Sequence, residues 1–137
     1  MGLNLGIRRE SFSPAENQSW LGSALGTQEC DSITLDGSAF IATWPDGIVP
    51  SGVALGKITA TGLYAPYDDA AVDGTEVMAG HLFTTTDLMS RTPYSAGAVQ
   101  DVPAPLYWHG EVVEANLPAN AGVDANGKAD VPLIHYV

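Results

Sequence analysis

The densest group of side chains that could bind a metal ion is the acidic set Asp68, Asp69, Asp73 and Glu76. A calcium loop needs oxygen ligands at alternating positions, a glycine turn and a distal bidentate glutamate. The stretch DDAAVDGTE lacks that alternation. We therefore interpret these carboxylates as a solvated acidic turn and predict no metal site there.

A second group of reactive types lies near the C-terminal end. Glu111 and Glu114 are three residues apart, and on a strand such positions point to opposite faces. Tyr107, His109 and Glu111 share a face, and a histidine beside a carboxylate can act as a base. No nucleophile motif such as G-x-S-x-G accompanies them. We predict a cross-strand or interface pair and no enzyme.

The remaining histidines and the single cysteine carry no recognisable site. His81 and His135 stand among apolar neighbours, and the three histidines lack the fixed spacing of a metal motif. Cys30 alone excludes an intrachain disulfide framework and a cysteine zinc cluster, which fits folding in a reducing cytoplasm. We predict no cofactor.

Charge and length exclude two classes of partner. The 137 residues contain sixteen acids and five bases, a net charge of −11. Such a chain is repelled by nucleic acid and by anionic lipid, because phosphate binding needs clustered Lys and Arg. No apolar run approaches ~18 residues, and no apolar stretch follows Arg8 and Arg9. We expect no nucleic-acid partner, no membrane span and no signal peptide.

Short runs of β-forming residues separated by turns indicate a mainly β, compact fold. The chain has 15 glycines and 9 prolines and no long amphipathic pattern. Asp36-Gly37 predicts a two-residue hairpin turn between residues 32–35 and 38–44. Further strands are predicted over residues 53–63, 77–84, 106–117, with a bulge at Gly110, and 132–137.

The apolar residues among the first thirty positions repeat with neither the period of 2 of a strand nor the period of 3.6 of a helix. This predicts an extended N-terminal arm over residues 1–30, ahead of a β-rich domain over residues 31–137. Isolated large apolar side chains are unusual in a free tail but suit an arm that docks on a partner. Together with the paired arginines they form the candidate contact set: Ile7, Arg8, Arg9, Phe12, Trp20 and Leu21.

The central tract resembles a family of bacteriophage proteins. Asp46-Gly47, residues 53–63, and Asp73-Gly74 followed by the run Val77 to Leu82 are similar in order and spacing to the lambda-type head decoration family. Gly110-Glu111-Val112 resembles that family's last long strand. The likeness spans residues 32–137.

The resemblance implies a β-tulip-like domain that forms a homotrimer and acts as capsid cement. It would seat at three-fold positions on the outer surface of the virion, bind the major capsid protein and stabilise the expanded shell. The family contacts the shell largely through its N-terminal segment, which suits an arm over residues 1–30.

A second function stays open. Trp20, Trp44, Tyr64, Tyr67, Tyr94, Tyr107 and Trp108 are aromatic residues that could stack on sugar rings. The alternative is therefore a carbohydrate- or receptor-binding β module, without catalysis, of a phage tail or a cell surface.

Overall fold

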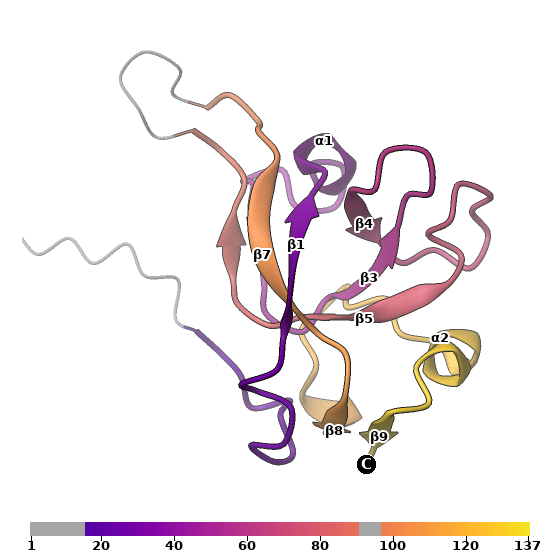
Figure 1. The fold of residues 1–137 in the computed structure, drawn as a ribbon. Coiled ribbons are helices and arrows are strands. Elements are labelled where there is room, and N and C mark those ends of the chain that lie inside the picture. The colour runs from indigo at the N-terminus through magenta and orange to yellow at the C-terminus, as the bar shows by residue number, and fades with distance from the viewer. Residues whose placement is uncertain (1–15, 91–96) are drawn as a thin grey trace, which may run out of the picture.

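Five strands close into a barrel, which confirms the mainly β prediction (Figure 1). The computed structural model describes residues 16–90 and 97–137. Around the barrel the strand order is β1-β4-β3-β5-β7, and there are two further small sheets, β2-β6 and β8-β9. Closing a sheet on itself removes free edges, so most backbone polar groups find partners.

The elements follow one another along the chain as short strands with little helix. They are β1 (Asp31–Leu35), α1 (Gly37–Phe40), β2 (Ile48–Val49), β3 (Ala54–Lys57), β4 (Tyr64–Pro66), β5 (Met78–Leu82), β6 (Thr86–Asp87), β7 (Val102–Tyr107), β8 (Gly110–Val112), the 3-10 helix η1 (Glu114–Asn116), α2 (Ala125–Asp130) and β9 (Ile134–Tyr136).

Strand β7 contains Pro103 and Pro105, yet strands pair with it on both sides. Proline has no N–H to donate, and the backbone groups of successive residues in a strand face alternate sides. The Phe83 N–H donates to the Pro105 carbonyl at 3.1 Å, so both prolines face away from β1. The antiparallel ladder with β1 is therefore intact over all five residues of that strand, whereas β5 pairs with β7 only at His81 and Leu82.

The predicted hairpin around Asp36-Gly37 is wrong. Residue Gly37 begins the short helix α1, and β1 pairs with the distant β7 instead of with residues 38–44. A side chain at position 37 would collide with the Gln100 carbonyl, and the Gly37 N–H donates to the Asp101 carboxylate at 3.1 Å. Glycine is needed here for close approach to β7, not for a hairpin turn.

Two long predicted strands are each divided. The run over 53–63 forms β3 and then turns at Gly62, whose φ is +74°, before β4 pairs back antiparallel. The run over 106–117 breaks after β7, and Gly110, with a φ of +136°, begins β8 in a separate sheet. Strand β9, inside the predicted 132–137 run, pairs parallel with β8.

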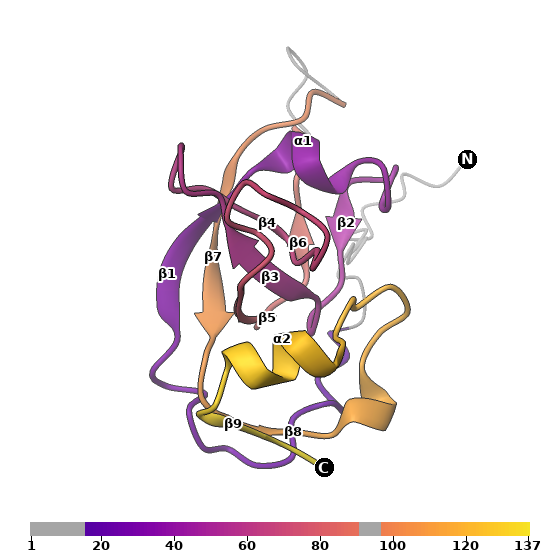
Figure 2. The same ribbon diagram turned by 90° about the vertical axis from the view of Figure 1, so that its right-hand side faces the viewer.

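Two groups of buried side chains fill the molecule. The upper core lies within the barrel: Ile33, Leu35, Phe40, Val49, Val53, Leu55, Leu82, Leu88, Ala104 and Leu106. The lower core lies where β8, β9 and α2 cover the end of the barrel (Figure 2): Trp20, Ala54, Tyr67, Met78, Tyr107, Val112, Val131 and Ile134.

The prediction that residues 16–30 belong to an extended arm is wrong. Trp20 is completely buried in the lower core, and Leu21 forms an antiparallel bridge with Val112 of β8. The Val113 N–H donates to the Trp20 carbonyl at 2.6 Å, and the Gly22 N–H donates to the Glu111 carbonyl at 3.0 Å. Burying the indole removes a large apolar surface from water and so stabilises this arrangement.

Candidate functional site

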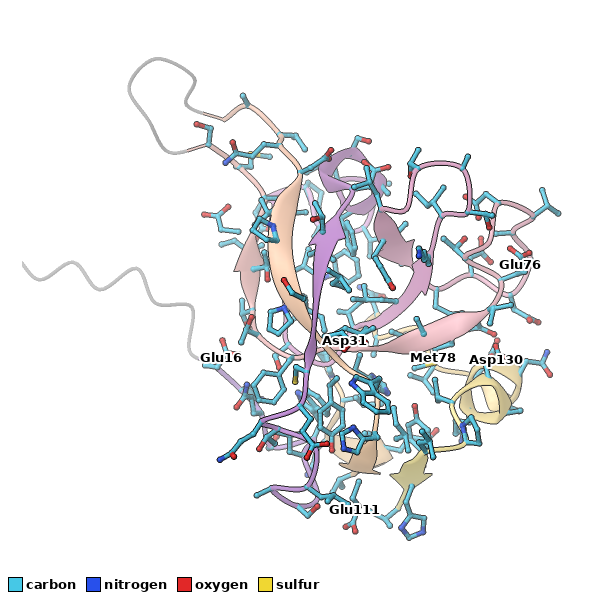
Figure 3. The ribbon with its side chains drawn as sticks, viewed as in Figure 1. Glu16, Asp31, Glu76, Met78, Glu111 and Asp130 are labelled. Carbon is cyan, nitrogen blue, oxygen red and sulfur yellow. The ribbon has the colours of Figure 1, made fainter. Side chains whose placement is uncertain are left out.

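The described chain begins next to the connection between β5 and β6. The Glu16 carboxylate accepts a hydrogen bond from the Thr85 N–H at 3.0 Å, and the Gln18 amide donates to the Phe83 carbonyl at 2.8 Å. Any arm formed by residues 1–15 therefore starts from this point of the barrel (Figure 3). The candidate contact residues Ile7, Arg8, Arg9 and Phe12 lie outside the described residues.

The other two candidate contact residues belong to the folded body. Trp20 donates from its indole N–H to the Ser51 hydroxyl at 3.0 Å and packs edge-on against Tyr107 with ring centroids 5.4 Å apart. Leu21 packs against the same lower core. Both side chains therefore stabilise the fold and are not exposed anchors for a partner.

The acidic tract shapes its own loop. The Asp73 carboxylate accepts from the Thr75 N–H at 3.1 Å and the Thr75 hydroxyl at 2.6 Å, and these bonds hold the pKa of Asp73 below its usual value. Glu76 accepts from the Gly74 N–H at 2.7 Å, and Asp68 accepts from the Ala70 N–H at 3.0 Å. Such local bonds define turns.

Helix α2 is joined to this loop and to β5. Its N-cap, Asp124, accepts from the Gly127 N–H at 2.7 Å and the Tyr67 hydroxyl at 2.9 Å, and its pKa is lowered chiefly by the Gly127 bond. At the other end of α2, the Asp130 carboxylate accepts from the backbone N–H of Met78 at 3.0 Å; both residues are labelled in Figure 3. The carboxylates again serve as acceptors for the framework.

Tyr107, His109 and Glu111 do not share one strand face as predicted, because the strand is interrupted before β8. The Tyr107 ring is buried, and its hydroxyl donates to the Leu25 carbonyl at 3.0 Å. His109 pairs with Glu29 rather than with Glu111, with Nε2 and Oε2 2.9 Å apart. Glu114 instead contacts Lys128, also at 2.9 Å. The contacts of His109 tie residues 22–30 to β8.

His81 lies at the junction of both cores and is fully buried. Its Nδ1 is 2.8 Å from the Gly52 carbonyl, and its Nε2 is 2.7 Å from the Tyr136 hydroxyl on β9. With Nδ1 as the donor, neutral imidazole accepts from the tyrosine, so both nitrogens are satisfied. Burial lowers the pKa of His81 from 6.5 to about 4, although the Gly52 bond opposes that shift. Sequence reasoning missed this pair because the two residues are 55 positions apart.

Several aromatic side chains considered for sugar stacking pack against other residues of the chain. Trp20, Tyr67 and Tyr107 are buried in the lower core. Trp108 is half-buried, lies against His109 with ring centroids 4.1 Å apart, and donates from its indole N–H to the Glu29 carbonyl at 2.8 Å. Rings packed inside the chain have no free face for a sugar.

Exposed apolar side chains are the contact candidates that sequence reasoning did not single out. Their exposure is a tertiary property, because apolar residues occur both inside proteins and on their surfaces. They are Leu25, Val72, Val77, Val99, Leu133 and Val137.

Within residues 16–90 and 97–137, no group of three or more His, Cys, Asp or Glu side chains is arranged so that it could hold a metal ion. The same described part has no helix that is both long and apolar enough to traverse a bilayer.

Comparison of the chain with protein-family models, with curated proteins and with solved structures found no match.

Proposed function

We propose that the chain is a capsid decoration protein that binds the major capsid protein as a homotrimer and stabilises the expanded shell. The observation that carries the proposal is the role of the resembling tract. Asp73 closes the turn before Thr75, and Gly74, at a φ of +112°, lies against the Lys57 carbonyl. A Cβ at Gly80, in β5, would likewise collide with the Tyr107 carbonyl. Residues behind the resemblance thus shape the barrel strand β5 and the loop before it, which supports a protein whose function is structural.

The chemistry of the described surface supports a binding role over a catalytic one. Asp68, Asp73, Glu76 and Asp124 accept hydrogen bonds from nearby backbone, and His81 is enclosed. Groups held in this way help to shape the molecule.

The arm in this proposal is limited to residues 1–15, because the segment after it belongs to the folded body. Within it, Ile7 and Phe12 supply apolar anchors and Arg8-Arg9 supplies positive charge in an otherwise acidic chain. Three arms on one trimer would multiply weak contacts into tight binding without a tight single site.

The test uses a truncation that leaves the lower core intact. Deletion of residues 2–15 should abolish co-sedimentation with expanded shells of a lambda-type major capsid protein, while the barrel stays folded by circular dichroism. A control is Val72→Ser, since Val72 is 96% exposed in the loop between β4 and β5 and should tolerate the change. Equal shell binding by the truncated chain would contradict the arm's role. A monomer at micromolar concentration in sedimentation velocity would contradict the trimer.

A further inference from the structure

The C-terminal residues 132–137, here the C-terminal strap, close the lower core. Strand β9 pairs only with β8, through three register pairs. The Gly110 N–H donates to the Leu133 carbonyl at 3.1 Å, and the Val137 N–H donates to the Val112 carbonyl at 2.9 Å. So short a ladder is a weak attachment in itself, because local opening costs least where few buried contacts are lost.

The strap is also fastened from inside by two side chains, the buried Ile134 of the lower core and Tyr136. Tyr136 extends inward and its hydroxyl meets Nε2 of His81 at 2.7 Å. The imidazole is enclosed by the Trp20 ring at 5.5 Å, by the Tyr136 ring at 5.8 Å and by the Gly52 carbonyl. Tyr107 lies opposite His81 in the neighbouring strand β7.

The groups packed on the imidazole are uncharged between pH 4 and pH 7. Tyr136 and Tyr107 both have a raised pKa, chiefly because of burial, so they stay protonated. Beyond the strap, Lys128 stands 5.8 Å from the Tyr136 ring and is paired with Glu114. An imidazolium formed inside this enclosure would therefore have no counterion in contact, and burying an uncompensated charge is costly.

We propose that the C-terminal strap is an acid-released latch, in which protonation of His81 leaves a charge without a counterion behind Tyr136 and frees β9 from β8. Protonation places a donor on both ring nitrogens, so the Tyr136 hydroxyl loses its acceptor and can stay only by turning to accept from Nε2. Release lets water reach the imidazolium. It also leaves the Gly110 N–H and the Val112 carbonyl as a strand edge that another extended segment can occupy.

The size of the response follows from linkage. If the open strap returns His81 to its ordinary pKa of 6.5, against about 4 when closed, acid favours the open form. Relative to pH 7, the opening equilibrium should rise about 20-fold at pH 5 and about 100-fold at pH 4.

Amide hydrogen exchange of the intact chain between pH 4 and pH 7 tests the latch. Protection factors of the Val137 and Gly110 amides should fall by those ratios, with the weak denaturant dependence of a local opening. The Asp36 amide, bonded to the Tyr64 carbonyl in the barrel, should stay more protected at every pH. Constant strap protection would overturn the proposal, and so would equal protection of all three amides, which indicates global unfolding.

Variants assign the response to one imidazole. His81→Gln keeps a donor and an acceptor and should abolish the acid response, whereas His135→Gln, an exposed site on the strap itself, should retain it. Tyr136→Phe should lower strap protection about 5-fold already at pH 7. If His81→Gln does not fold, an NMR titration of His81 in the unmodified chain tests the latch instead. The pH at the midpoint of this titration must coincide with the pH at which the strap amides lose protection. Protonation of His81 while the strap amides stay protected would overturn the latch.

Discussion

The upper and lower cores are built from different chemistry, although they share the barrel. The upper core contains nine aliphatic side chains and Phe40, all supplied by the barrel strands and the segments between them. The lower core centres on Trp20, Tyr67 and Tyr107, and each has a polar atom that is hydrogen-bonded within the protein. Aliphatic packing depends on volume alone, whereas a core with polar atoms also depends on every partner being present.

This difference decides where the molecule is sensitive. In the upper core, a substitution removes contacts and leaves a cavity. In the lower core, a substitution of Trp20, Tyr67 or Tyr107 also orphans a donor or acceptor, and protonation of a single atom alters the network. We therefore expect the lower core to respond both to smaller chemical changes and to pH.

The largest effect should come from Trp20→Ala. Loss of a buried tryptophan costs about 3–5 kcal/mol, and here the Ser51 hydroxyl also loses its indole donor. Urea unfolding followed by circular dichroism measures the change. Leu55→Ala, a matched buried site in the upper core, should cost about 3 kcal/mol. If the tryptophan variant were the more stable of the two, residues 16–30 would not be part of the core.

The second largest effect should be the dependence of the free energy of unfolding on pH, which should distinguish the lower core from the upper core. His81 has a folded pKa of about 4 against 6.5 when unfolded, so the unfolded chain binds the extra proton between these values. The stabilisation is complete above pH 6.5 and is lost as the pH falls toward 4, about 3 kcal/mol in all. The free energy of unfolding at pH 7 and pH 4 checks this. Removing the imidazole with His81→Gln should reduce the difference by that amount, and an unchanged difference would refute the assignment.

Gly110→Ala should weaken the attachment of the lower core. A Cβ at this position would meet the Tyr107 hydroxyl and lie 2.5 Å from the Leu25 carbonyl, at a φ of +136°. We expect a loss of about 2 kcal/mol. Gly62→Ala is the matched control, because Gly62 also has a positive φ but no atom within 4 Å of its Cβ position. Comparing the thermal unfolding of the two variants separates the cost of the steric clash from the cost of the positive φ. Equal losses of stability would show that the cost of the clash is negligible.

The smallest effect should come from the N-cap of α2. Asp124→Ala removes the acceptor for the Gly127 N–H and should cost about 1 kcal/mol. Asp124→Asn retains an acceptor and should cost only about a few tenths of a kcal/mol. Chemical denaturation measures the difference between the two variants, provided that m, the slope of the free energy of unfolding against denaturant concentration, is the same for both. A larger loss in the asparagine variant would indicate that the carboxylate charge, rather than the cap, holds α2.

Several of the strands could be predicted from local pattern. The predicted strands over 77–84 and 132–137 contain β5 and β9, and glycine and proline marked many of the breaks. The interpretation of the acidic tract as a turn agrees with its carboxylates, since Asp73 and Glu76 bond to residues within two positions. Turns and strand runs are governed by neighbours in sequence, so the chain alone reveals them.

Residue spacing misled where a glycine served a distant contact. Asp36-Gly37 has the composition of a hairpin turn, yet Gly37 is needed for approach to Gln100. Likewise, Trp20 stands in a run without period, which predicts an arm, while its indole completes a core made by Ala54, Tyr107 and Val112. No local pattern signals these contacts.

By itself, the sequence determined a glycine-rich, acidic β protein whose carboxylates shape turns, because composition and short-range hydrogen bonding depend on adjacent residues. Only the tertiary structure decided that β1 pairs with β7, that residues 16–30 fold into the lower core, and that His81 meets Tyr136. Those pairings join residues far apart in the chain. They form because closing the barrel buries apolar surface that no local segment can cover alone.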